Sequence, residues 1–216
     1  MIERKDVTAP PAFQNYINKA GDDELYAALN KNTKNFRKFL KDIPRKKIDY
    51  AYAEGKWTIK QLLQHIIDAE RVFVLRALWF TRKDPSPQPG FEENIWADNA
   101  NVSERKWKTM VEEFFLLRAA NESFFEALSE EELMRIGSSN GNMMTPAALA
   151  FVCAGHVEHH IGIMKERYLA EEKKEKKDAK KPKPAKVKEL KVSEEPKEPK
   201  AAKEKNKKKK KIAKSL

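Results

Sequence analysis

The stretch TIKQLLQHIIDAERVFVLRALWFTR, residues 58–82, decides the fold class of this chain. Apolar residues occupy much of its circumference at helical spacing, which is typical of a helix buried on most sides. Thr58 can cap the first turn, and the proline-rich run from Asp84 to Gly90 ends the pattern. The stretch therefore predicts a long helix in the core of the molecule.

Outward from this helix, three more segments show helical spacing of apolar residues. The first runs from Asp22 to about Asp42, with Asp22 or Asp23 as its cap and Pro44 after its end. The others are 103–128 and 145–169, the latter with Thr145 as N-cap and Pro146 at the first helical position. Four helices of about 20 residues without long strands predict an all-α protein, an antiparallel four-helix bundle.

The connections are long for a minimal bundle, and long loops often frame a site. Segment 91–102 is expected to be a loop with aromatic anchors at Phe91 and Trp96, and segment 137–144 to be a second loop. Ser129 and Glu132 have capping-box spacing for one short turn between them. Residues 1–21, with their Pro-Pro pair, are expected to be a lead on the surface. The bundle then occupies residues 22–169.

Residues 170–216 form a Lys-rich C-terminal tail. They hold 20 of the 44 basic residues, all lysine, and 9 of the 33 acidic ones, so this segment carries the whole formal charge of +11. From Glu171 onward it has no aromatic residue, which predicts disorder. Without arginine for base contacts or aromatic rings for stacking, we expect only non-specific, salt-sensitive contact with polyanions.

The single cysteine, Cys153, cannot form an internal disulfide, which favours a reducing compartment. The N-terminal residues have no signal-peptide pattern, and no uncharged apolar stretch of transmembrane length is evident. We therefore expect a cytoplasmic protein without a membrane partner.

All four histidines lie in two of the predicted helices, as His65, His156, His159 and His160. His156 and His160 are spaced i and i+4, so they share a helix face on a mostly apolar stripe. His65 lies in the most buried helix and can converge with them if the two helices are neighbours. Three imidazoles suit a divalent transition metal ion, here zinc, nickel, iron or manganese, with copper a further imidazole-binding metal, and leave coordination positions open.

Three nearby residues have alternative interpretations. His159 lies at the edge of the same face, where it can be a donor to a ligand, a substrate contact or rim; it is the best candidate for a catalytic base. Asp68 can orient the His65 ring or can simply be exposed. Cys153 can be a fourth ligand, but we favour a small buried filler.

The segments 57–80, 89–107 and 155–169 resemble the second-helix, central-loop and last-helix motifs of the DinB/YfiT-like superfamily. They include Trp57-Thr58, His65, Asp68, Glu70, Arg71 and Arg76, and then His156 and His160 at the ligand positions. The resemblance covers about Ala20 to Leu169. It implies an up-down-down-up bundle, a three-histidine divalent metal site, frequent dimers and activities that are mostly thiol-dependent. The Lys-rich tail is a departure from the pattern.

Three hypotheses of function follow. The first is a metalloenzyme, a thiol-dependent transferase or a metal-dependent hydrolase, that acts on a small electrophile between the helices and segment 91–102. The second is a non-catalytic stress or binding module whose ion braces the bundle. The third is a nucleic-acid-associated protein that acts through residues 170–216.

Overall fold

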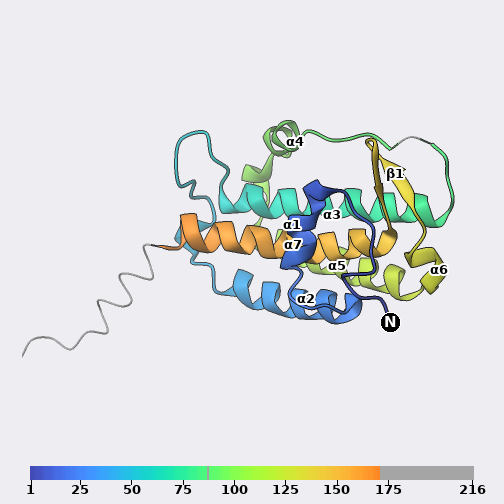
Figure 1. The fold of residues 1–216 in the computed structure, drawn as a ribbon. Helices are drawn as coiled ribbons and strands as arrows, with labels where there is room; N and C mark the ends of the chain where they lie inside the picture. The colour runs from blue at the N-terminus through green and yellow to red at the C-terminus, as the bar shows by residue number, and fades with distance from the viewer. Residues whose placement is uncertain (87, 171–216) are drawn as a thin grey trace, which may run out of the picture. The chain divides into compact units, whose positions relative to one another are not determined.

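The computed structural model describes residues 1–86 and 88–170, in which four long helices form a bundle (Figure 1). These helices are α2 (Leu25–Lys41), α3 (Ile59–Thr81), α5 (Trp107–Glu126) and α7 (Pro146–Ile163), which continues as a π-helical turn, Met164–Tyr168. Each of α2 and α3 packs against both α5 and α7, so α2 and α3, which follow each other in the chain, lie on a diagonal of the bundle. The four helices run up-down-down-up in chain order (Figure 1). The predicted all-α four-helix bundle is confirmed.

Local capping fixes the starts of the two helices that carry the histidines. Thr58 and Gln61 form a reciprocal capping box at the start of α3. At the start of α7 the Thr145 hydroxyl accepts a hydrogen bond from the Ala148 amide. Both starts agree with the sequence prediction.

The other two long helices begin later than predicted. The N-cap of α2 is Glu24, whose carboxylate accepts from the amides of Tyr26 and Ala27, whereas Asp22 accepts from the Glu24 amide just outside the helix. Helix α5 begins at Trp107 rather than Ser103, because Val102–Glu104 forms a separate 3-10 turn.

The expectation of a surface lead over residues 1–21 is wrong. Pro11–Lys19 forms helix α1, which crosses α7 and buries Ile17 completely (Figure 1). The crossing is close because Gly155 of α7 has no side chain: a Cβ there would lie 1.7 Å from the Tyr16 carbonyl oxygen. Helix α1 is therefore part of the packed fold.

Both segments expected to be loops contain short elements. Segment 91–102 includes α4 (Glu93–Asn99), and segment 137–144 is a hairpin of β1 (Gly137–Ser139) and β2 (Asn142–Met144). Asn140 and Gly141 take positive φ values at its turn, as an Asn-Gly hairpin turn requires. The short helix α6 (Glu130–Leu133) starts with the predicted Ser129 capping box, and a further 3-10 turn spans Arg45–Lys47.

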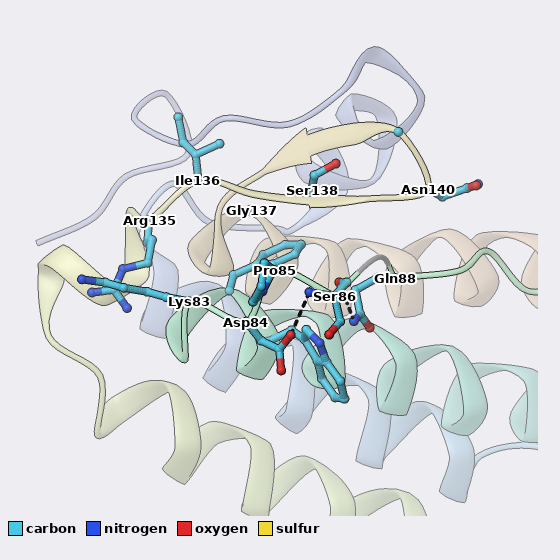
Figure 2. Close-up of a pocket in the computed structure, with 13 residues that line it drawn as sticks. Lys83, Asp84, Pro85, Ser86, Gln88, Arg135, Ile136, Gly137, Ser138 and Asn140 are labelled. Carbon is cyan, nitrogen blue, oxygen red and sulfur yellow. Dashed lines mark hydrogen bonds between the residues drawn. The ribbon is translucent and has the colours of Figure 1, made fainter.

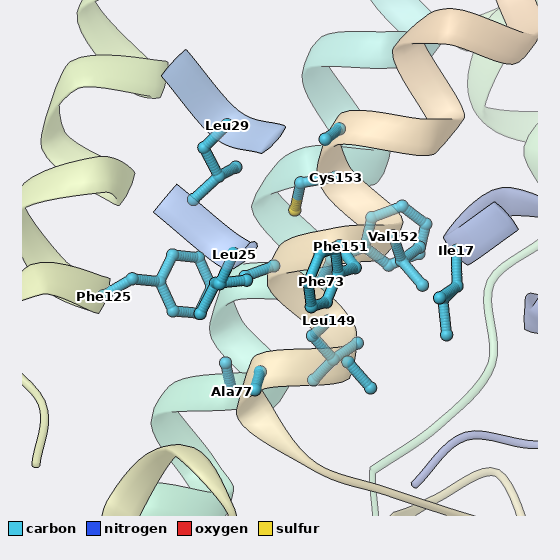
Figure 3. Packing of buried hydrophobic residues seen from close by; sticks show 14 of the residues in the cluster. Ile17, Leu25, Leu29, Phe73, Ala77, Phe125, Leu149, Phe151, Val152 and Cys153 are labelled. Carbon is cyan, nitrogen blue, oxygen red and sulfur yellow. The ribbon is translucent and has the colours of Figure 1, made fainter. Parts of the chain in front are cut away.

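The core combines apolar clusters with one buried polar network. Figure 3 shows part of an apolar cluster in which Leu29, Phe73 and Cys153 pack together. Beside it the Arg118 guanidinium is 1% exposed and donates to both Glu70 carboxylate oxygens, at 2.7 and 2.6 Å. It also donates to the Asn32 side chain and the Cys153 carbonyl oxygen, so the network joins α2, α3, α5 and α7.

Two expectations, the lack of a transmembrane stretch and the disordered tail, concern the C-terminal part of the chain. The helix Pro146–Tyr168 is long and apolar enough to cross a membrane, but 78% of its most apolar stretch is buried inside the fold, as in a core helix. The predicted disordered tail lies, from residue 171 onward, outside the described residues.

Candidate metal centre

Helices α3 and α7 bring His65, His156 and His160 together. The Nε2 atom of His156 lies 3.1 Å from the Nε2 atoms of both other rings. Among the described residues, these three form the group whose candidate ligand atoms all lie within 4.8 Å of one another. The predicted convergence of the three imidazoles is confirmed.

The donor atoms fit a metal ion. Zinc–nitrogen bonds of about 2.0–2.1 Å in a tetrahedral site place two ligand nitrogens about 3.3 Å apart, close to the separations seen here. Two imidazole lone pairs at such a distance repel each other unless a proton or a cation lies between them. Three nitrogens facing one point can all be satisfied by a single cation.

Burial favours the neutral, ligating form of the rings. It lowers the pKa of His65 to about 4 and that of His160 to about 3. The pKa of His156, which is 4% exposed, is held well below its usual range by burial and by the neighbouring histidines. The lone pairs of all three rings are therefore available at neutral pH.

Within the described part of the chain, the imidazoles are held by ring contacts, and no carboxylate bonds to them. Trp57 packs on His65, with ring centroids 5.0 Å apart, and Phe73 meets His156 edge-on at 5.6 Å. The Nδ1 atom of His160 is buried and has no hydrogen-bond partner among the described residues.

Of the two interpretations of Asp68, a hydrogen bond to the His65 ring is not seen among the described residues. Its carboxylate accepts hydrogen bonds from Gln64 at 2.9 Å and from Arg71 at 3.4 Å, on the side of α3 that faces α5. The Cys153 thiol is buried in the apolar cluster of Figure 3 and is not part of the three-histidine group. Burial raises the pKa of this thiol well above its ordinary value, in agreement with its interpretation as a filler.

His159 lies beside the cluster at intermediate burial, as its position at the edge of the helix face predicts. Its ring centroid is 5.1 Å from that of His160 and 5.4 Å from that of Tyr16. Burial and the charges of Lys19 and Arg167 lower the pKa of His159. A neutral, partly accessible imidazole next to the three ligands is able to accept a proton.

A cavity of about 290 Å³ opens in front of the histidines. Phe13 and Tyr16 form part of its wall, and their place there was not predicted because residues 1–21 were expected to lie on the surface. Segment 91–102 does contribute to it, through Phe91 and Glu93. The lining also includes Trp57, Ala69, Phe73 and Arg76, together with all four histidines.

A larger cavity of about 650 Å³ lies between the hairpin and the end of α3 (Figure 2). It holds none of the histidines, and its Arg135 guanidinium already donates to the Thr81 carbonyl oxygen and to Glu131. The residues that can bind a metal ion or accept a proton at neutral pH therefore line the smaller, histidine-lined cavity.

Comparisons with known proteins indicate the family to which the chain is similar. The family model described as the DinB superfamily matches residues 28–164. Proteins of Bacillus cereus (strain B4264) and Bacillus anthracis (strain A0248), each named "putative metal-dependent hydrolase", are 34% identical over 62 residues. That match covers 28% of this chain and 35% of each relative, so the chain aligns with about a third of their length.

Two solved structures share the fold. YfiT from Bacillus subtilis, described as a probable metal-dependent hydrolase with an unusual four-helix bundle topology, is 14% identical with a TM-score of 0.60. The similarity covers 68% of this chain and 86% of YfiT. A mycothiol-dependent maleylpyruvate isomerase is 13% identical with a TM-score of 0.53, covering 74% of this chain and 62% of that one.

Proposed function

Because the chain belongs to the DinB superfamily, we propose that it is a divalent-metal-dependent enzyme that transfers a low-molecular-weight thiol to a small electrophile. The observation that carries the proposal is the convergence of three Nε2 atoms at the wall of a cavity. Three protein ligands are the number typical of a reactive site, whereas structural zinc sites have four. A structural neighbour described as a mycothiol-dependent isomerase supports the thiol dependence.

His65, His156 and His160 would hold the ion, which we propose to be zinc, nickel, iron or manganese. A bound divalent ion supplies Lewis acidity, which stabilises a thiolate or lowers the pKa of water to about 7. Trp57 packs on the His65 ring and Phe73 packs on the His156 ring, so these two imidazoles would be positioned before any substrate enters.

The remaining cavity residues would bind and orient the reactants. Phe13, Tyr16 and Phe91 provide apolar walls that exclude water from an electrophile. His159 would accept the thiol proton at a ring nitrogen, since burial and nearby cations keep this imidazole neutral. Tyr16 packs edge-on against both His156 and His159 and would orient the base.

Metal analysis of the full-length protein, stripped with chelator and reloaded, tests the proposal. We expect one ion per chain in the wild type and loss of stoichiometric binding in His156→Ala, because the central ring contacts both other ligands. His159→Gln should keep the ion and lose turnover in a panel of thiols and model electrophiles. Unchanged metal content in His156→Ala, or turnover independent of metal, would refute the proposal.

A metal-dependent hydrolase is the second candidate, favoured by the names of the curated relatives. It would use the same ligands but need no thiol, so turnover of esters or amides in thiol-free buffer would support it. A non-catalytic module is the remaining alternative. Cobalt-substituted protein separates it from both enzymes, because azide or thiol changes the visible spectrum only at an open coordination site.

Two proposals concern the context of the enzyme. We expect a cytoplasmic protein that forms a homodimer. Light scattering of the purified protein measures its molar mass and so tests the homodimer. The Lys-rich residues 170–216 would make only non-specific contacts with polyanions. Removing residues 171–216 should abolish any salt-sensitive retention on DNA; equal retention by the shortened chain would contradict a role for this segment.

A further inference from the structure

The histidine cavity contains a buried cation without an acidic partner. Arg76 of α3 lines the cavity and is 7% exposed. Its guanidinium donates to the Pro89 carbonyl oxygen at 3.0 Å and forms no ion pair with any carboxylate among the described residues. A guanidinium has five N–H donors, so most of its hydrogen-bonding capacity is not used by these residues.

The second deeply buried arginine provides a contrast. Arg118 is satisfied by a bidentate bond to Glu70 and by three further acceptors, two on α2 and one on α7. Burial lowers the pKa of Arg76, and no neighbouring carboxylate raises it again. A buried charge without a partner is costly, and an arginine remains protonated even then.

The position of Arg76 along α3 directs it toward the metal ligands. It follows His65 by 11 residues, which is close to three full turns, so both side chains lie on the same face of the helix. The two Cα atoms are about 16 Å apart along the axis, and helical side chains lean toward the N-terminus, here toward His65. The cavity between them is lined by Ala69 and Phe73, which occupy the same face of α3.

We propose that Arg76 binds the carboxylate of a reactant whose other end reaches the three histidines. This proposal rests on the proposed function and adds its substrate class: an acidic small molecule, with several bonds between the carboxylate and the reacting group. The carboxylate can belong to the thiol or to the electrophile. Glu93 lines the same cavity but is exposed, which leaves Arg76 as the buried charge that an entering anion meets.

The test compares a carboxylated thiol with a neutral thiol of the same length. Cobalt-loaded, full-length protein is titrated with mercaptohexanoate and with mercaptohexanol, and the visible spectrum reports binding. We expect the wild type to prefer the carboxylated thiol by about tenfold to a hundredfold, as for a charged hydrogen-bonded pair. Arg76→Met should reduce this preference to less than about threefold and leave the affinity for mercaptohexanol unchanged.

Arg167 offers a matched control, because it lines a separate cavity of about 230 Å³ on the other side of His160. Arg167→Gln should keep the preference for mercaptohexanoate. If Arg76→Met keeps it, or Arg167→Gln alone removes it, the proposal is overturned. Arg76→Lys should retain part of the preference, since it keeps the charge but loses the bidentate geometry.

A second titration separates this proposal from the proposed function. Calorimetry with hexanoate, which carries no thiol, measures the contribution of Arg76 directly. Hexanoate binding that is lost in Arg76→Met, with neither thiol altering the cobalt spectrum, would support the carboxylate site and refute the thiol transferase. If both thiols change the cobalt spectrum and Arg76→Met alters neither titration, the thiol transferase is supported and the carboxylate site is refuted.

Discussion

Replacing Arg118 with methionine tests the polar network that joins the four long helices. In the wild type this guanidinium contacts both Glu70 oxygens, and Glu70 is itself 2% exposed. In the variant, the Glu70 carboxylate keeps only the amide of Asn121, at 3.0 Å. Leaving a buried carboxylate without its cation costs about 3–5 kcal/mol, so the free energy of unfolding should fall by that amount.

Thermal and urea unfolding of metal-free protein measure this change without a contribution from ion binding. For a chain of this size the loss corresponds to a midpoint lowered by about 6–20 °C. Arg71→Met is the matched control on the same helix, because its ion pair with Glu113 is partly exposed and should contribute less than about 1 kcal/mol. The double variant Glu70→Leu/Arg118→Met should recover most of the stability, since no charge then remains buried. An Arg118→Met midpoint within about 2 °C of wild type would refute the reasoning.

Three further predictions concern the site. Gly155→Ala should destabilise the fold by about 1–3 kcal/mol and displace Tyr16, because the new methyl group meets the carbonyl oxygen of Tyr16. The control Gly162→Ala has open space around the new methyl group and should be neutral or stabilising in the same unfolding assay. Without metal, the low pKa values of His65 and His160 mean that the unfolded chain binds more protons below pH 6.5. The unfolding midpoint should therefore be highest above that pH and fall as the pH drops toward 4; a flat profile would contradict the assigned burial. Zinc at about a hundred times its dissociation constant should stabilise the stripped protein by about 2.7 kcal/mol, measured as a raised midpoint that His160→Ala lacks.

The sequence predicted those features that depend on neighbours within one helix. The capping residues Thr58 and Thr145 lie three positions from their partners, and His156 and His160 are one turn apart. Local signals of this kind determine where α3 and α7 begin and which face carries the histidines. The hairpin turn at Asn140-Gly141 has a local signal as well, an Asn-Gly pair that favours a two-residue turn, although a loop was predicted there.

The features that were missed depend on contacts between distant parts of the chain. Phe13, Tyr16, Ile17 and Ala20 have the spacing of one helix face behind Pro11, but the depth to which α1 is buried depends on Gly155 of another helix. Arg118 interrupts an apolar stripe of α5, and only the position of Glu70 on α3 explains why a cation can lie there.

The cavity in front of the histidines has walls from two parts of the chain. His65, His156 and His160 lie within residues 28–164, which the family model matches, whereas Phe13 and Tyr16 lie in the nine-residue helix α1 before them. Under the proposed function, substitutions at Phe13 and Tyr16 should change which molecules fit the cavity while the three histidines stay unchanged.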